Sequence, residues 1–208
     1  MKVVCINGSP RKEGNTFLTL TAMSEVFDQN GIESEILQVG SGDVKGCIAC
    51  EGCSETAKCA IPDPQLEEWS DKILSADGIV LAAPAYFGSM PGTMKAFMDR
   101  CFFACTRGGK IRGKVGASVA ILRRSGGFTT VDDLNRYFYS SEMILVTAPG
   151  SHTVHGRAPG EVTQDPEGMN GVRKLAANMS WVLEMIEATK GTIEPPEFTK
   201  RTMTNFIR

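Results

Sequence analysis

Short runs of consecutive apolar residues, rich in Val, Ile, Leu and Ala, recur along the chain. Each run is bounded by Gly, Pro or polar residues, which is typical of strands that are buried on both faces of a parallel sheet. The four runs are Lys2 to Asn7, Gly78 to Ala83, Lys114 to Leu122 and Met143 to Thr147. A fifth segment, Glu33 to Val39, alternates more and carries charge, so it predicts an edge strand.

Between these strands, apolar residues recur at helical spacing. Leu20, Met23 and Phe27 form one such stripe, and the segments Met94 to Cys105 and Val172 to Ile186 carry others. The alternation of strands and helices predicts a doubly wound, three-layer α/β domain with five parallel strands and right-handed crossovers. In such a domain, ligands bind at the carboxyl ends of the strands.

The chain of 208 residues is long enough for one sizeable core. We expect one domain at residues 1–190, followed by a C-terminal tail at residues 191–208. The tail contains Pro195 and Pro196 and has no periodic pattern, although Phe198, Met203, Phe206 and Ile207 could anchor it. It is therefore expected to wrap a neighbouring chain or the surface of its own domain.

The charge balance offers no electrostatic footprint for nucleic acid, because 22 Lys and Arg face 24 Asp and Glu and the net charge is −2. The longest apolar runs, such as Ile79 to Ala83, have the length of a strand, far below the roughly twenty residues that cross a bilayer. No signal peptide is recognisable at the N-terminus. We expect a cytoplasmic protein that binds neither nucleic acid nor membrane.

The first predicted strand runs into the segment GSPRKEGNT, residues 8–16, before a helix begins. Ser9, Asn15 and Thr16 supply donors at a helix N-terminus, where the helix dipole favours an anion, and Arg11 adds a cation suited to phosphate. The segment lacks the Lys of a Walker loop and the G-x-G-x-x-G of a dinucleotide fingerprint, so a phosphate monoester fits best. The alternative is a plain Gly-rich connection in which Asn15 caps the helix.

Two further loops follow the third and fourth strands. The first carries Pro84, Ala85, Tyr86, Phe87 and Gly88, whose aromatics could flank a planar ring or could seal the edge of the sheet. The second carries Ser125, Gly126 and Gly127 after two arginines, and it offers backbone donors to the anionic edge of such a ring. Arg123 and Arg124 could equally face solvent.

Four of the seven cysteines lie in the predicted loop after the second strand, residues 46–62. Cys47, Cys50, Cys53 and Cys59 are spaced C-x2-C-x2-C-x5-C, which is typical of an iron-sulfur ligand set. A zinc site or a surface loop of bare thiols remains open, whereas an odd cysteine count does not suit a disulfide framework.

The remaining candidates for chemistry have structural interpretations. Cys5, Cys101 and Cys105 lie on apolar stripes and are expected to be buried small hydrophobes. His152 and His155 lie in the segment after the fifth strand and are expected to have packing or surface roles.

Together these segments resemble the flavodoxin-like NADPH-dependent FMN reductase superfamily and, within it, the iron-sulfur flavoproteins. GSPRKEGNT is similar to the superfamily's phosphate loop, and PAYFGSMPGTMKAFMDR at residues 84–100 is similar to its flavin-ring loop and following helix. The compact cysteine run is similar to the signature of the subgroup. The resemblance covers nearly the whole chain, and only the cysteine run selects the subgroup.

The resemblance implies a flavodoxin-like sheet of order 2-1-3-4-5, FMN, a 4Fe-4S cluster and a homodimer or homotetramer. Ser9, Arg11, Asn15 and Thr16 would hold the phosphate, Pro84 to Gly88 and Ser125 to Gly127 the flavin ring, and the four loop cysteines the cluster. No residue is a candidate general acid or base, which suits chemistry that the cofactors carry.

The implied activity is electron transfer from a ferredoxin-like donor through the cluster to FMN and then to an acceptor. The cysteine loop is expected to leave the edge strand, whereas the ring should lean toward the loops after the third and fourth strands. We therefore expect cluster-to-FMN transfer between chains of at least a dimer. One alternative is a cluster-free reductase of FMN or quinones that takes electrons from NAD(P)H. A second alternative, of another class, is a non-enzymatic redox or metal sensor.

Overall fold

The computed structural model describes residues 1–150, 152–199, 202, 204, 206 and 207. Its strands are β1 (Lys2–Asn7), β2 (Glu33–Gln38), β3 (Gly78–Pro84), β4 (Val115–Leu122), β5 (Ile144–Leu145) and β6 (Thr153–His155). Its helices are α1 (Asn15–Gln29), α2 (Cys53–Thr56), α3 (Pro64–Ser75), α4 (Gly92–Phe97), α5 (Phe103–Thr106), α6 (Gly127–Ser140) and α7 (Pro166–Thr189). A π-helix at Met98–Phe102 joins α4 to α5, and 3-10 helices lie at Arg107–Gly109 and Glu161–Gln164.

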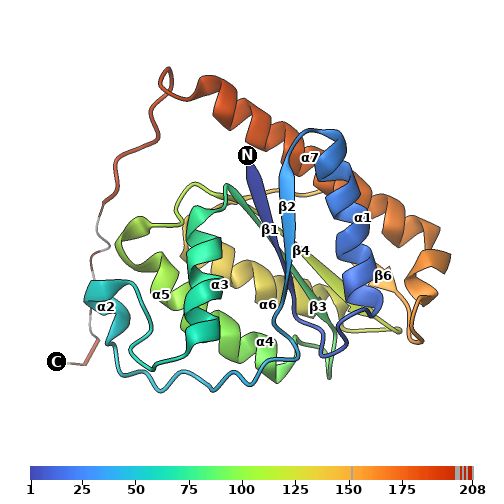
Figure 1. Ribbon diagram of the computed structural model, residues 1–208, viewed down its shortest axis with the longest axis horizontal. Coiled ribbons are helices and arrows are strands. Elements are labelled where there is room, and N and C mark those ends of the chain that lie inside the picture. Colours follow the sequence, from blue (N-terminus) through green and yellow to red (C-terminus); the bar gives the residue numbers. More distant parts are fainter. Residues whose placement is uncertain (151, 200–201, 203, 205, 208) are drawn as a thin grey trace.

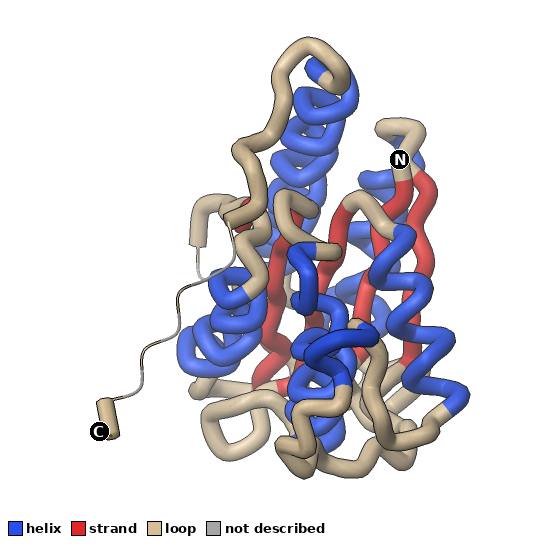
Figure 2. The backbone as a smooth tube through the Cα atoms, turned by 90° about the vertical axis from the view of Figure 1, so that its left-hand side faces the viewer, coloured by secondary structure: helices blue, strands red, loops and turns tan. Residues whose placement is uncertain are grey.

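The sheet is parallel and its strands lie in the order β2-β1-β3-β4-β5, which confirms the predicted order (Figure 1). β4 is buried along its whole length and β3 up to its last residue, as expected for central strands that helices cover on both faces. β2 is the edge strand, and only Leu37 of its residues is buried. Figure 2 shows the strands side by side with helices in front of and behind them.

Two apolar clusters fill the space on the two faces of the sheet. One packs α1 and α7 against the sheet and contains Leu20, Met23 and Phe27. The other packs α3 to α6 against the opposite face, and the rings of Trp69 and Phe97 meet edge to face at 5.5 Å there. Each fully buried side chain of this size contributes about 1.5 to 3 kcal/mol. The predicted three-layer arrangement is therefore confirmed.

The start signals of two long helices are readable in the sequence. Asp63 precedes Pro64 at the start of α3, and its Oδ1 accepts a hydrogen bond from the Leu66 backbone N–H at 3.1 Å. Asp165 and Pro166 start α7 in the same way. An acidic cap followed by Pro satisfies an unpaired backbone donor and pre-sets the first helical turn.

The fifth strand differs from the prediction of Met143 to Thr147. β5 contains only Ile144 and Leu145, which pair with the first two residues of β4. After Pro149 and Gly150 the chain returns as β6, which pairs in parallel with the last three residues of β4. Pro has no backbone N–H and Gly weakens a strand, so the ladder is interrupted there. His155, which was expected in a loop, is the last residue of β6.

The loop after β2 crosses the molecule to reach the cysteines. In Figure 1 it runs from the lower end of β2 along the carboxyl edge of the sheet to α2, on the side of α3 and α5. Its return leads into α3. The sequence placed this loop beside the edge strand, whereas the fold carries it to the helices that follow β3 and β4.

The tail beyond α7 contacts its own domain in the part that the structure describes. Arg112 Nη2 donates to the Pro196 carbonyl at 2.7 Å, and the Phe198 ring lies against Gly109. Phe206 and Ile207 are exposed, and Met203 lies outside the described residues. The division of the chain at residue 190 stays a prediction.

Candidate functional site

The segment after β1 forms a turn that is held by its own polar groups. The Ser9 N–H donates to Asn7 Oδ1 at 3.0 Å, and Gln38 Nε2 donates to the Ser9 carbonyl at 2.7 Å. The Arg11 N–H donates to Ser9 Oγ at 3.1 Å. These bonds tie the turn to the ends of β1 and β2. The loop is therefore fixed before any ligand arrives.

The N-terminus of α1 opens into this turn. Gly14 occupies the position before the helix, and no described side chain caps it. The first backbone N–H groups of a helix have no partner within the helix, and the dipole makes that end positive. Thr16 is buried at this end and Arg11 is exposed beside it. The arrangement is suited to an anion, and the binding of a phosphate by these residues stays a prediction.

A cavity of about 220 Å³ joins three of the predicted segments. Ser9, Arg11, Asn15 and Thr16 line it from the first loop, Pro84, Ala85 and Tyr86 from the end of β3, and Ile121, Leu122 and Arg123 from the end of β4. It lies at the carboxyl ends of the central strands, where the strand order reverses. This is the place where open α/β sheets bind their ligands.

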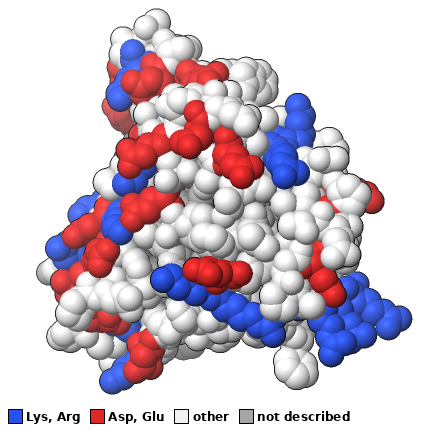
Figure 3. Space-filling model, turned by 45° about the vertical axis from the view of Figure 1, so that its right-hand side comes forward, with Lys and Arg blue, Asp and Glu red and all other residues white. Residues whose placement is uncertain are grey.

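A fourth segment, Gly156 and Arg157, lines the same cavity, and sequence reasoning missed it. Arg11, Arg123 and Arg157 are all exposed and together place three cations around the cavity. Figure 3 shows basic side chains gathered near the bottom of the view, the end toward which β1 runs in Figure 1. The signal in the sequence was only one Arg between two glycines, far from the first loop.

Both polar atoms of the Asn15 side chain already have hydrogen-bond partners. Its Nδ2 donates to the Ala158 carbonyl at 2.9 Å, and its Oδ1 accepts from the Gly160 N–H at 2.8 Å. Asn15 therefore fixes the loop that carries Arg157. The predicted contact of Asn15 with the phosphate would therefore come from its backbone N–H, and this contact stays a prediction.

The two loops predicted to hold a flavin ring lie against each other. The Thr129 hydroxyl donates to the Gly88 carbonyl, and a side chain at Gly126 would meet Gly88 Cα at 2.8 Å. Gly126 has a φ of 89°, which favours glycine. Phe87 is fully exposed at a φ of 52°, and Phe128 is exposed after the second loop. Phe87, Gly88 and Ser125 to Gly127 do not line the cavity, so their contact with the ring stays a prediction.

The four loop cysteines line a second cavity, of about 460 Å³. Cys47 and Cys50 are exposed, whereas Cys53 and Cys59 are half-buried. The backbone between them takes left-handed conformations at Ala49, Glu51 and Ala57, which have φ values of 53°, 58° and 55°. Such conformations cost about 1 to 3 kcal/mol each and cluster at ligand sites. The opposite wall is formed by Asp99, Arg100, Phe102, Phe103, Thr106, Tyr137, Ser140 and Ser141.

The chemistry of the donor set suits an iron-sulfur cluster, because the four candidate ligands are thiols around one cavity. Over the described residues, no three His, Cys, Asp or Glu side chains are grouped closely enough to hold one metal ion. A cluster takes one thiolate at each corner of a compact body, whereas zinc draws its ligands to within about 2.3 Å of one point. Four thiols spread around one cavity suit the first geometry.

The other three cysteines are buried, as predicted. Burial raises the pKa of the Cys5 thiol to about 12. Burial likewise raises the pKa of Cys101, whose Sγ lies 3.1 Å from Ser70 Oγ. Neither Cys101 nor Cys105 lines the cavity of the loop cysteines. The protein thus separates buried thiols from the four at the cavity.

Comparison with known proteins agrees with this geometry. The family model described as NADPH-dependent FMN reductase matches residues 1–156. An iron-sulfur flavoprotein of Methanocaldococcus jannaschii is 36% identical over 194 residues, covering 90% of this chain and 100% of the relative. The chain belongs to the NADPH-dependent FMN reductase family, among its iron-sulfur flavoproteins. It is a flavin-dependent oxidoreductase.

A second relative, an iron-sulfur flavoprotein of Methanosarcina thermophila, is 31% identical over 192 residues, and the alignment covers 99% of that relative. That alignment spans 91% of this chain. Among solved structures, RosB with a bound 8-demethyl-8-formylriboflavin-5'-phosphate has a TM-score of 0.71 at 16% identity, over 100% of this chain and 93% of its own. The last likeness supports the flavodoxin-like fold alone. None of the helices in the described part of the chain is long and apolar enough to cross a membrane.

Proposed function

We propose that this flavoprotein carries FMN and a 4Fe-4S cluster and transfers electrons from a ferredoxin-like donor to an acceptor. The cluster supplies one-electron steps and FMN one- or two-electron steps, so that electrons would enter at iron and leave from the flavin. The observation that carries the proposal is the pair of cavities: one lined by four thiols, the other an anion site at the carboxyl ends of the strands.

Different residues of the chain would hold the phosphate, the flavin ring and the cluster. Ser9, Arg11 and the first backbone N–H groups of α1 hold the phosphate, and Arg123 and Arg157 neutralise it. The loops Pro84 to Gly88 and Ser125 to Gly127 hold the ring, and Phe87 shields it from water. The thiolates of Cys47, Cys50, Cys53 and Cys59 hold the cluster.

We further propose a homodimer or homotetramer in the cytoplasm. Trp181, Met185 and Ile186 lie exposed on α7, and Phe206 and Ile207 are exposed in the tail. Large apolar side chains that gather on a surface support association. Scattering at several protein concentrations would measure the assembly.

The deciding experiment is anaerobic purification followed by quantitation of iron, sulfide and FMN and by an EPR spectrum of the reduced protein. We expect four irons and four sulfides for each FMN, and faster flavin reduction by reduced ferredoxin than by NADPH. FMN without iron or sulfide would refute the cluster. Rapid reduction by NADPH alone would refute the proposed donor.

A second candidate is a cluster-free reductase of FMN or quinones that uses NAD(P)H. The three exposed arginines around the flavin cavity favour it, because they could also bind the phosphates of a dinucleotide. Activity after removal of iron separates the two, since this candidate would keep full activity with NAD(P)H.

A further inference from the structure

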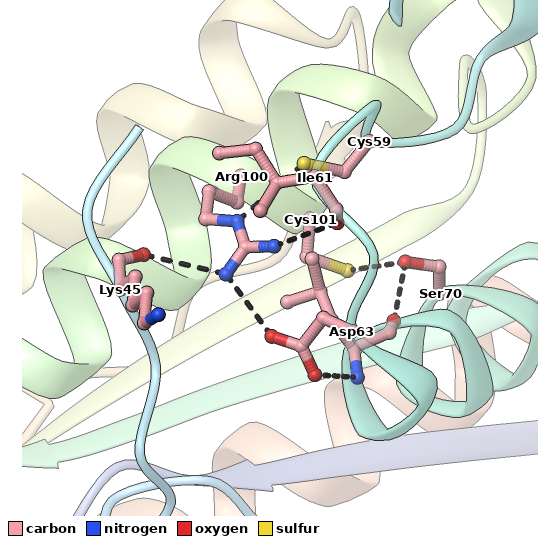
Figure 4. Close-up of polar contacts among 8 residues, drawn as sticks. Lys45, Cys59, Ile61, Asp63, Ser70, Arg100 and Cys101 are labelled. Atoms are coloured by element: carbon pink, nitrogen blue, oxygen red, sulfur yellow. Dashed lines mark hydrogen bonds and ion pairs between the residues drawn. The ribbon is translucent and has the colours of Figure 1, made fainter. Parts of the chain in front are cut away.

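A single arginine lies behind the cysteine loop. Arg100 belongs to the π-helix Met98–Phe102, its side chain is 1% exposed, and it lines the cavity of the four cysteines. Figure 4 shows its guanidinium among Lys45, Cys59, Ile61 and Asp63. Short π-helical segments are often found at functional sites.

The guanidinium binds both ends of the cysteine loop. On the side before Cys47, Nη1 donates to the Lys45 carbonyl at 3.5 Å. On the side after Cys59, Nη2 donates to the Ile61 carbonyl at 3.1 Å, and Nη1 pairs with Asp63 Oδ2 at 3.0 Å. One rigid side chain thus joins the entry and the exit of the loop (Figure 4).

The Nε donor of Arg100 points to sulfur. Arg100 Nε lies 3.4 Å from Cys59 Sγ and donates to it. A hydrogen bond and a positive charge at a ligand sulfur stabilise the reduced, more negative state of an iron-sulfur centre and so raise its reduction potential.

The charges around Arg100 also favour a negatively charged partner at Cys59. Within the described residues, Asp63 is the only carboxylate at ion-pair distance from Arg100, and the carbonyls of Lys45 and Ile61 are neutral. The Asp63 carboxylate is also shared, because its Oδ1 caps α3. A buried cation is costly unless it is well paired. As a ligand of the proposed cluster, Cys59 would supply the second negative partner.

We propose that Arg100 is a positioning residue of the cluster site, which clamps the cysteine loop and donates to the Cys59 thiolate. This inference rests on the proposed function. It assigns Arg100 two separable effects: retention of the cluster, through the clamp, and a raised cluster potential, through the bond to sulfur.

The potential is tested on the anaerobic, FMN-loaded holoprotein. In Arg100→Gln, the ratio of reduced to oxidised cluster at a fixed potential should fall about tenfold, which is about 59 mV for one electron. Arg100→Lys keeps the charge but not the planar fork, so it should shift the ratio less. EPR follows the cluster during the titration. The FMN midpoint in the same samples should stay unchanged and serves as an internal control.

Arg112→Gln is the matched control variant. Arg112 also pairs with one carboxylate, Glu142, at 2.8 Å and donates to two backbone carbonyls, those of Pro196 and Glu197, but it does not line the cysteine cavity. Its loss should leave the cluster potential and the iron content at their wild-type values.

The clamp is tested by the rate at which a chelator removes iron. Asp63→Asn keeps the cap of α3 and the bond to Cys59 but loses the ion pair. We expect it to release iron several-fold faster with little change in potential, and this variant decides the clamp if Arg100→Gln fails to fold. A wild-type cluster potential and a wild-type rate of iron release in both Arg100 variants would overturn this inference and leave the proposed function standing. A wild-type protein without iron and sulfide would overturn the proposed function and, with it, this inference.

Discussion

Asn15, the first residue of α1, forms a hydrogen bond with Gly160, which lies 145 residues later in the loop between β6 and α7. Asn15 Oδ1 accepts from the Gly160 N–H at 2.8 Å, while its Nδ2 donates to the Ala158 carbonyl at 2.9 Å. Arg157, one residue before Ala158, lines the cavity of about 220 Å³ at the carboxyl ends of the strands together with Arg11. The helix whose N-terminus is proposed to bind the phosphate therefore also positions a second cation.

Replacing Asn15 with Ala should loosen that loop. Two hydrogen bonds are lost, each worth about 0.5 to 1.5 kcal/mol, so the free energy of unfolding should fall by about 1 to 3 kcal/mol. FMN affinity should fall as well, because Arg157 is no longer held. Urea unfolding and a fluorescence titration of the apoprotein with FMN measure the two quantities.

A double-mutant cycle with Arg157→Ala tests the link between Asn15 and Arg157. If Asn15 acts through Arg157, the double variant should bind FMN about as weakly as the weaker single variant. Strictly additive losses of binding free energy would instead show that Asn15 and Arg157 act on FMN separately.

Arg11→Ala should weaken FMN binding by about 1.5 to 3 kcal/mol, the range for hydrogen bonds to charged groups. Because Arg123 and Arg157 share the cavity, the lower end is expected, and the loss should shrink as salt is added. Isothermal titration of the apoprotein at two salt concentrations measures it. Arg173→Ala, at an exposed position on α7, is the matched control. Unchanged affinity in Arg11→Ala would remove Arg11 from the site.

The turn between β1 and α1 could be predicted from the sequence because its information is local. Gly8 to Thr16 are contiguous, and a turn between a buried strand and a helix carries its own signal. Arg157 could not be predicted, because it reaches the cavity only through the return strand β6, after the interrupted fifth strand. Pairing between distant segments leaves no periodic trace in one sequence.

The place of Arg100 was missed for a different reason. A helix of 3.6 residues per turn places Met94, Phe97, Met98 and Cys101 on one stripe and leaves Arg100 beside it. The π-helix changes this register, and Arg100, Cys101 and Phe102 are all buried in succession. The charged residue within this apolar segment was the available signal.

Stability should depend on pH through His152, one of only two histidines. Burial lowers the pKa of His152, and its Nε2 accepts from the Ala148 N–H at 3.0 Å, which requires a neutral ring. The unfolded chain binds a proton near pH 6.5 and the folded protein only below that. The free energy of unfolding should therefore be largest above about pH 6.5 and fall as pH decreases through the folded pKa.

Urea unfolding of the FMN-loaded protein between about pH 5 and pH 8 measures this dependence. His152→Gln should flatten the profile over that range, because the amide oxygen can still accept from Ala148 but does not titrate. An equal slope in His152→Gln and the wild type would contradict the assignment.

The last prediction separates the loop cysteines from the buried ones. Cys59 lines the same cavity as Cys47, Cys50 and Cys53 despite its longer spacer. Cys59→Ala should keep FMN, whose predicted site is the other cavity, and lose most of its iron, because a cluster with one open corner readily loses metal. Iron, sulfide and flavin quantitation after anaerobic purification measures this.

Cys105→Ala is the matched control, because Cys105 in α5 directly precedes Thr106 of the cavity wall yet does not itself line the cavity. This variant should retain the full cluster with at most a modest loss of stability from a small buried side chain. Full iron in Cys59→Ala, or an equal loss of iron in Cys105→Ala, would show that the fourth ligand had been assigned to the wrong cysteine. Both variants keep the Arg11 side of the molecule intact, so a loss of FMN in either would point to misfolding rather than to ligation.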